Sequence, residues 1–279
     1  MSIFKDCDIR GIYDSEINEE SVYRIGRGLA AMLPPGGEIR VGGDVRLSTP
    51  SLKESLIAGL VRGGARVADL GVIPTPVLYY ALSGSSADAG ATVTASHNPP
   101  EYNGIKFMFG HEPVARRTID ALEDIVTRGA FADGEGSVSR LDILPAYLAS
   151  LSKRFGARRP LKVVVDAGNG AMSAVAPVAF RSAGYRVTEL FCEPDGAFPN
   201  RSPNPAEHSV LGALCEKVVE TQADLGVAFD GDGDRAAFVD EKGRCIHNEK
   251  ALILFVKKLL ADRPTPVVFD QKSSSAVRD

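Results

Sequence analysis

The sequence has no tryptophan and few cysteines. Its four cysteines are Cys7, Cys192, Cys215 and Cys245, scattered over 279 residues. No two of them form a C-x-x-C pair, which argues against a zinc knuckle and against a thioredoxin-type redox pair. A few scattered cysteines in a chain of this length are typical of the reducing cytosol, so we expect a cytoplasmic protein.

Long hydrophobic runs and an excess of basic charge are missing as well. The longest apolar candidate, residues 251–260, contains two adjacent lysines and falls short of the roughly 18–20 residues that span a membrane. The N-terminal segment "MSIFKDCDIRGIY" has no long apolar core, which argues against a signal peptide. The net charge of −4 does not favour general binding to nucleic acid. We therefore expect a globular protein that binds neither membranes nor nucleic acid.

Strand-like and helix-like stretches alternate along the chain, which is typical of an α/β architecture. We predict strands at residues 38–44, 66–72 and 89–96. We predict helices at residues 49–64, 74–82 and 118–130, the first ending in glycine and the second beginning at proline. At roughly 100–200 residues per domain, the chain length suggests two domains.

One sequence pattern recurs three times at the spacing of a domain. Residues 39–52, 161–175 and 265–277 each contain an apolar strand, an aspartate, a short turn and then a serine followed by apolar residues. The aspartates are Asp44, Asp166 and Asp270. Any strand–turn–helix could look like this, but the spacing favours duplicated α/β units over a solenoid, whose period would be about 20–50 residues.

The repeat predicts domain boundaries. The first domain would occupy residues 1–150, the second residues 157–262, and residues 263–279 would be the truncated start of a third. A lone strand and a stub of helix cannot bury a core, so the chain would either belong to something longer or dock its tail on another surface. An unpaired strand at 266–270 would also offer an edge for self-association.

Three aspartates alternate with glycines in "AFDGDGDRAAF". Asp230, Asp232 and Asp234 follow an apolar strand, and like charges this close repel one another unless a cation lies among them. Ligands that are all oxygen suit a hard ion such as Mg²⁺ or Ca²⁺. An EF-hand loop is disfavoured, because Arg235 stands where that loop needs glycine and both flanks look like strands. A solvated acidic turn without metal is the remaining alternative.

A second polar cluster lies in "GATVTASHNPPEYNGIKF", residues 90–107. Thr94, Ser96, His97 and Asn98 follow an apolar run and precede two prolines, and Lys106 follows an Asn-Gly turn. This pattern suits an ordinary turn, a nucleophile or a phosphate site. Nearby, Arg46 and Ser48 could line the same site or form a salt bridge and a turn.

Four stretches together resemble the α-D-phosphohexomutases, and within them the phosphomannomutase/phosphoglucomutase branch. They are "DIRGIY", "TASHNPPEYNGIKF", "EPDGAFPNRSPNP" and "DGDGDR", in that family's order and approximate spacing. That family has four domains, the first three with a related α/β fold. The resemblance therefore implies two tandem related α/β domains with mixed sheets between helices, and it implies that domains III and IV follow in the full-length chain.

The resemblance also implies roles for individual residues. Ser96 would be the serine that carries the phosphoryl group, and one Mg²⁺ per site would be bound by Ser96, Asp230, Asp232 and Asp234. Lys106 would be the acid/base group, with a pKa lowered by the metal and by other cations. The resemblance further implies that Arg10 and Arg235 surround the phosphoserine and that His97 and Asn98 lie beside it. It also implies that the substrate is contacted by Asn98, Lys106 and Arg235.

The reaction implied is intramolecular phosphotransfer on a hexose phosphate, with hexose 1,6-bisphosphate as intermediate or activator. It would interconvert the 1-phosphate and the 6-phosphate of mannose or glucose. The sequence departs from the family at Cys7, where tyrosine is common, and it lacks the "GE-x-SGH" loop that recognises the sugar. We therefore expect an N-terminal part that is inactive or weak alone.

Several alternatives remain at this stage. The chain could be an independent metal-dependent phosphosugar phosphatase or phosphotransferase, or a non-catalytic binding module. His97 could accept the phosphoryl group in place of Ser96. Residues 166–173, "DAGNGAMS", resemble a phosphate loop without its spacing, and we interpret them as a tight turn packed between domains.

Overall fold

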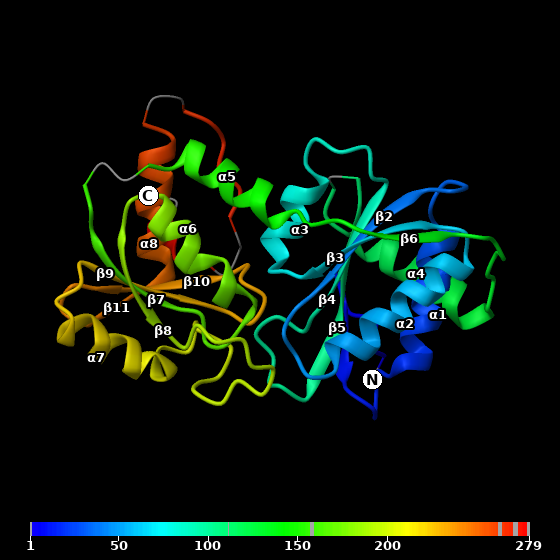
Figure 1. Cartoon of the computed structure of the whole chain (residues 1–279), viewed down its shortest axis with the longest axis horizontal. Helices are drawn as coiled ribbons and strands as arrows, with labels where there is room; N and C mark the ends of the chain where they lie inside the picture. The colour runs from blue at the N-terminus through cyan, green and yellow to red at the C-terminus, as the bar shows by residue number, and fades with distance from the viewer. Residues whose placement is uncertain (1, 111, 157–158, 262–263, 270–272, 278–279) are drawn as a thin grey trace.

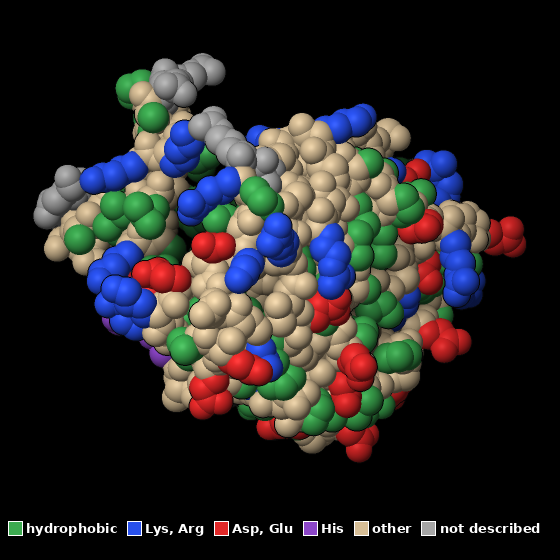
Figure 2. All heavy atoms as spheres, turned by 60° about the vertical axis from the view of Figure 1, so that its left-hand side comes forward, with side chains coloured by type: hydrophobic (Ala, Val, Ile, Leu, Met, Phe, Trp, Pro, Cys, Tyr) green, Lys and Arg blue, Asp and Glu red, His purple; other side chains and the backbone are tan. Residues whose placement is uncertain are grey.

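The computed structural model describes residues 2–110, 112–156, 159–261, 264–269 and 273–277. These residues form a six-stranded sheet and a five-stranded sheet, each flanked by helices and lying side by side (Figure 1). Among them, no helix is both long and apolar enough to cross a bilayer. Both signs of charge share the face drawn in Figure 2.

The first sheet is mixed, as predicted. Its central strands are parallel, and β5 joins them antiparallel on one side and pairs antiparallel with β1 on the other. The strand order is β1 (Ile9–Ile12), β5 (Tyr102–Phe109), β4 (Ala89–Val93), β2 (Glu38–Gly43), β3 (Arg66–Val72) and β6 (Ser137–Arg140). One face is covered by α1 (Glu19–Ala31), α2 (Thr49–Arg62) and α4 (Arg116–Arg128), and the other by α3 (Thr75–Leu82).

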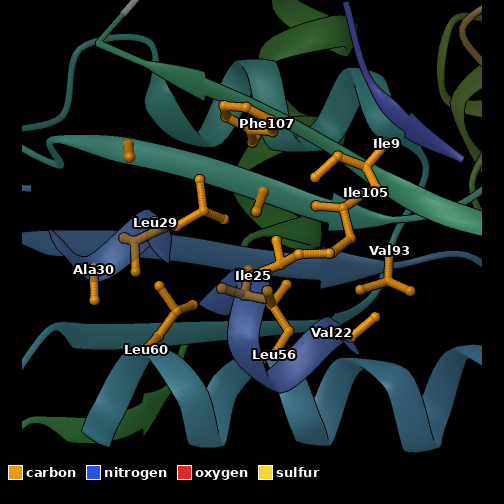
Figure 3. Close-up of a cluster of buried hydrophobic side chains, with 14 of the residues drawn as sticks. Ile9, Val22, Ile25, Leu29, Ala30, Leu56, Leu60, Val93, Ile105 and Phe107 are labelled. Carbon is orange, nitrogen blue, oxygen red and sulfur yellow. The ribbon is translucent and has the colours of Figure 1, made fainter. Parts of the chain in front are cut away.

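Helix α1 shows why this layer forms. Asn18 and Ser21 exchange side-chain and backbone hydrogen bonds at its start, which satisfies amides that the first turn leaves free. Its apolar residues recur at helical spacing, so Ile25 and Leu29 face the sheet and meet Leu56 of α2 (Figure 3). These buried side chains form the core of the first domain.

The second sheet has the order β11 (Cys245–Ile246), β10 (Ala236–Asp240), β9 (Leu225–Phe229), β7 (Lys162–Asp166) and β8 (Arg186–Leu190). Strand β7 is parallel to both neighbours, whereas β9, β10 and β11 are antiparallel to one another. One face packs on α6 (Ala176–Ser182) and the other on α7 (Gly212–Glu220), and α8 (Asn248–Leu259) follows β11. The predicted fold class, two tandem α/β domains with mixed sheets, is confirmed.

Helix α5 (Leu144–Arg154) connects the two domains (Figure 1). Its residues Leu144 and Tyr147 contact apolar clusters of both domains. The predicted end of the first domain, residue 150, therefore lies inside this connecting helix. The predicted start of the second domain, residue 157, comes just after the helix in the chain.

Two units of the predicted repeat are present in the structure. Asp44 directly follows β2, Asp166 ends β7, and a turn and a helix come after each. In the third unit, Asp270 lies outside the described residues, and residues 264–269 form no strand. Residues 266–269 pair with none of the described strands and Val268 is 97% exposed, as expected of an unpaired segment, and the prediction that this segment is a strand with a free edge stays a prediction.

Candidate functional site

Two loops from different domains meet at the domain junction. The first, residues 94–98, follows β4, and the second, residues 230–235, connects β9 to β10. Ser96 Oγ donates a hydrogen bond of 2.8 Å to Asp230 Oδ2, and both residues are fully buried. The contact joins residues 134 positions apart, so only the tertiary structure creates it.

The loop that carries Ser96 is held in an unusual conformation. Ser96 has φ = 54°, in the left-handed region where a side chain costs free energy. Its amide donates to Thr94 Oγ1 at 2.9 Å, and that hydroxyl donates to Asp44 Oδ2 at 2.7 Å. The strand predicted at 89–96 therefore ends at Val93, because Thr94 and Ser96 form this turn instead.

Arg46 lies beneath the same loop and supports it. Its side chain is completely buried and forms an ion pair of 3.1 Å with Asp44. Its guanidinium also donates to four backbone carbonyls, those of Ser96, Asn98, Pro99 and Tyr102. Of the two alternatives for Arg46, the structure shows the salt bridge, and Ser48 Oγ likewise accepts a hydrogen bond from Asn103 inside the protein.

The three aspartates form a compact carboxylate cluster. Asp230, Asp232 and Asp234 each place one oxygen within 4.8 Å of the others. Burial, followed by the charges of Asp232 and Asp234, raises the pKa of Asp230 to about 7. The EF-hand alternative is wrong, because the loop joins two antiparallel strands, and a solvated turn does not fit the burial of Asp230 and Asp232.

Asp232 has one oxygen that suits a cation. Its Oδ2 accepts hydrogen bonds of 2.6 Å from both Thr75 and Lys106, whereas its Oδ1 is buried and has no hydrogen-bond partner among the described residues. A buried carboxylate oxygen without a partner costs free energy unless a ligand binds it. With Asp230 and Asp234 alongside, the oxygen-only donor set fits a hard divalent cation such as Mg²⁺.

Lys106 projects from β5 onto this cluster. Its Nζ lies 2.6 Å from Asp232 Oδ2 and 2.5 Å from Asp234 Oδ2. Burial works to lower the pKa of Lys106, but the two carboxylates outweigh it and raise that pKa above its ordinary value. This direction holds for the metal-free protein, in which Lys106 contacts the carboxylates directly, and the lowered pKa that we expect beside a bound metal stays a prediction. The same ammonium and the Thr75 hydroxyl counteract burial at Asp232 and lower the pKa of that residue.

The other predicted residues surround Ser96. Arg10, on β1, donates to Asn98 Oδ1 at 2.9 Å and pairs with Asp8. The guanidinium of Arg235 contacts the imidazole of His97 across the domain junction. Burial and then the positive charges of Arg235 and Arg10 lower the pKa of His97, which favours the neutral imidazole.

A pocket of about 640 Å³ opens beside these groups. Arg10, Lys106, Asp234 and Arg235 line it, so it combines fixed positive charge with the edge of the carboxylate cluster. Cys7, the position that departs from the family pattern, also lies on its wall. All site residues predicted from the sequence thus lie close together, either on the wall of this pocket or in the two loops behind it.

Sequence reasoning missed residues of α3. The Thr75 hydroxyl donates to the Asp232 carboxylate and the Thr75 amide donates to the Asp232 carbonyl at 2.8 Å, which ties the first domain to the aspartate loop, residues 230–235. Tyr79, one turn later, lines the pocket. The Pro-Thr-Pro sequence at the start of α3 was the available signal, since it positions a helix N-terminus and a hydroxyl together.

The "EPDGAFPN" motif packs the second domain onto the first. A Cβ atom at Gly196 would lie 2.4 Å from the carbonyl oxygen of Val45, so only glycine allows this approach. The Phe198 ring lies 5.1 Å from the Arg46 guanidinium carbon, a cation–π contact across the junction.

Behind the aspartate loop, the second domain repeats the arrangement of the first. Arg201 pairs with the buried Asp166 at 2.8 Å and donates to the carbonyl of Phe229, the residue before Asp230. The "DAGNGAMS" turn packs on this loop within its own domain, since the Ala171 amide donates to the carbonyl of Gly231 at 2.9 Å. Met172 of the same turn also lies near the first domain, since a Cβ atom at Gly233 would lie 2.5 Å from Met172 Cγ and 3.2 Å from Pro74 Cβ. Our expectation that this turn packs between the domains therefore stays a prediction.

Fold and site together define a two-domain α/β protein with a buried serine, a lysine and three carboxylates at the domain junction. Two family models match it, the phosphoglucomutase/phosphomannomutase alpha/beta/alpha domain I over residues 1–133 and domain II over residues 145–243. The chain belongs to the phosphoglucomutase/phosphomannomutase family.

Curated relatives and solved structures agree with this placement. The chain is 42% identical over 274 residues to the phosphomannomutase/phosphoglucomutase of Pseudomonas aeruginosa, covering 97% of this chain and 59% of the relative. It is 38% identical over 277 residues to a phosphoglucomutase of Neisseria meningitidis, covering 98% of this chain and 60% of the relative. A crystal structure of a family protein from Burkholderia thailandensis matches with a TM-score of 0.89 at 36% identity, covering 94% of this chain and 59% of that one. The chain thus spans about three fifths of the length of these relatives.

Proposed function

We propose that this chain is the phosphoryl-transfer part of a hexose-phosphate mutase, an isomerase that moves a phosphoryl group between the 1- and 6-positions of mannose or glucose. The observation that carries the proposal is the 2.8 Å hydrogen bond from Ser96 to Asp230. It places a nucleophilic hydroxyl from one domain against a carboxylate cluster of the other. The names of the relatives, phosphomannomutase/phosphoglucomutase and phosphoglucomutase, support the same reaction.

Ser96 is the proposed phosphoryl carrier. At the start of the proposed cycle Ser96 carries a phosphoryl group, which it passes to a sugar hydroxyl. Ser96 then recovers a phosphoryl group from the hexose 1,6-bisphosphate that this step forms. Phosphoryl transfer requires positioning and neutralisation of the moving charge more than covalent chemistry from the protein. The strained φ of Ser96 and its support by Arg46 supply the positioning.

One Mg²⁺ is the proposed metal, held by Ser96, Asp230, Asp232 and Asp234. When bound, Mg²⁺ supplies Lewis-acid stabilisation of the negative charge on the transferring phosphoryl group. The partnerless Oδ1 of Asp232 and the oxygen-only donor set support this choice of ion.

The basic residues around Ser96 have separate proposed roles. Arg10 and Arg235 line the pocket and would neutralise the phosphoryl oxygens, while His97 and Asn98 hold those arginines in place through the contacts described above. Lys106 would exchange a proton with the sugar hydroxyl. With the Asp232 and Asp234 charges neutralised, burial favours its neutral amine, the form that accepts a proton.

The sugar-reading part is proposed to lie in domains III and IV of a longer chain. Of the twelve described residues that line the pocket beside Lys106, ten belong to the first domain and five of these lie on β5 and α3. Without the sugar-reading part, this chain alone should transfer a phosphoryl group at most weakly and without strong sugar selectivity. Cytoplasmic location is also proposed, and the four unpaired thiols of the structure are compatible with it.

Intact-mass measurement tests the carrier role directly. The chain is incubated with glucose 1,6-bisphosphate and Mg²⁺, and the mass of one added phosphoryl group is expected. Ser96→Ala should abolish the adduct, whereas His97→Ala should retain it at reduced yield. Retention in Ser96→Ala together with loss in His97→Ala would instead identify a phosphohistidine and overturn the proposal. Steady release of inorganic phosphate would favour the phosphatase alternative.

A further inference from the structure

The second domain contains a pair of thiols that the proposed reaction does not use. Cys215 lies on α7 and Cys245 on β11, thirty positions apart in the chain. Their Sγ atoms are 3.7 Å apart, and both side chains are half-buried within the cluster that joins α7 to the sheet. Neither touches the pocket or the aspartate loop.

The backbone around this pair is closely packed. Cys245 pairs with Val239 across the β10–β11 hairpin, which sets the position of its side chain. The hairpin turn presses on α7, because a Cβ atom at Gly243 would lie 2.9 Å from the Cys215 carbonyl oxygen. The two sulfurs therefore face each other as a result of the fold, and a bond of about 2.05 Å requires them to approach by less than 2 Å.

We propose that Cys215 and Cys245 form a reversible intramolecular disulfide when the protein meets an oxidant of the peroxide class. One thiol, as thiolate, attacks the O–O bond and takes one oxygen, giving a sulfenic acid and releasing the first water. The second thiol attacks that sulfur, forming the S–S bond and releasing the second water. Two thiols lose two electrons and two protons in total, and one peroxide becomes two waters.

The other cysteines lack this arrangement. Cys192 donates its thiol hydrogen to the carbonyl of Val165 at 3.3 Å, and Cys7 is exposed beside the proposed active site. Burial, followed by the neighbouring Cys245, raises the pKa of Cys215 to about 11, so little thiolate is present at neutral pH. Formation of the disulfide should therefore be slow compared with oxidation of an exposed thiol. Once formed, the disulfide should persist until a reductant is added.

The crosslink would close a chain loop that contains the whole aspartate hairpin. Asp230 to Asp234 lie at one end of β10, whereas Cys245 pairs near the other end. The disulfide should stabilise the second domain by restricting its unfolded state without displacing the carboxylates. This inference is independent of the proposed mutase activity.

Thiol counting and peptide mapping test the proposal. After removal of reductant, the chain is held with hydrogen peroxide, quenched and alkylated, and digested with trypsin. Cys215 and Cys245 should lose their thiols together, a peptide pair joined through these two residues should appear, and the thermal midpoint should rise by several degrees. Dithiothreitol should reverse all three changes.

Matched variants separate this outcome from general oxidation. Cys215→Ser and Cys245→Ala should each abolish the joined peptide and the rise in thermal midpoint, whereas Cys192→Ser should retain both. If Cys215 and Cys245 stay reduced while Cys7 is oxidised, or if they appear only in mixed disulfides between molecules, the proposal is overturned. Circular dichroism of the reduced variants verifies that they are folded.

Discussion

Asp230 illustrates how strongly a residue's chemistry depends on its neighbours. It is fully buried, and burial and two adjacent carboxylates raise its pKa to about 7, against about 3.9 for an unfolded aspartate. Between these values the folded chain binds more protons than the unfolded chain, so the stability that this group contributes at low pH is lost as pH rises to about 7.

The contribution of Asp230 to the free energy of unfolding of the metal-free protein should therefore fall between about pH 4 and 7, by at most about 1.4 kcal/mol per pH unit. Urea denaturation in EDTA at several pH values measures the slope. Asp230→Asn, which cannot ionise, should flatten it. An identical slope in the wild type and in Asp230→Asn would show that Asp230 does not titrate in this range.

Arg46 is the residue on which the Ser96 loop depends most. It pairs with a buried Asp44 and donates to four loop carbonyls, contacts that a lysine cannot reproduce. Arg46→Lys should therefore destabilise the protein by about 3 kcal/mol and lower the yield of phosphorylated Ser96.

Arg62→Lys serves as the matched control for Arg46→Lys. Arg62 is half-exposed and pairs with Asp133 on the surface, so this change should alter stability by less than about 0.5 kcal/mol. Chemical denaturation and the intact-mass measurement are made on both variants. Equal effects of the two substitutions would contradict the role given to Arg46.

At the scale of elements, the aspartate loop approaches the Ser96 loop without space for a side chain. A Cβ atom at Gly231 would lie 2.5 Å from the carbonyl oxygen of Ser96. Gly231→Ala should push the loops apart, lower the thermal midpoint and slow phosphorylation of Ser96. Gly212→Ala is the control, because a Cβ atom at this first residue of α7 would meet no atom within 4 Å. It should leave phosphorylation of Ser96 unchanged and leave the thermal midpoint unchanged or slightly higher. Normal phosphorylation kinetics in Gly231→Ala would contradict the close approach.

The elements that sequence could predict are those with a strong local pattern. The helices at 49–64, 74–82 and 118–130 and the strands at 38–44 and 66–72 agree with the structure within a few residues. Strand β6 was missed, because "SVSR" is exposed on both faces and is held only by backbone pairing with β3. Residues 266–269 show the converse case: their apolar pattern is strand-like, but none of the described strands pairs with them.

At the scale of the whole molecule, the proposed metal site joins the two domains. Ser96 comes from the first domain and the aspartates from the second, so a bound ion should stabilise them against separation and unfolding. Mg²⁺ at 100 times its dissociation constant should add about 2.7 kcal/mol to the free energy of unfolding. Thermal unfolding with and without Mg²⁺, together with calorimetry, measures this effect.

Asp232→Ala should abolish both the Mg²⁺ binding and the stabilisation. Asp120→Asn, which changes a surface carboxylate paired with Arg116, is the control and should retain them. If Asp232→Ala binds Mg²⁺ as the wild type does, the assignment of the metal site is wrong.

The sequence by itself determined the alternation of elements, the duplicated unit around Asp44 and Asp166, and the motifs that carry the family resemblance. These depend on neighbours along the chain, where periodicity and turn chemistry act. Only the tertiary structure decided that Arg46 holds the Ser96 loop, that Thr75 donates to Asp232, and that the pKa of Lys106 is raised in the metal-free protein. Each of these depends on burial and on charges that come within hydrogen-bond distance from positions tens to more than a hundred residues apart, distances that local sequence patterns do not encode.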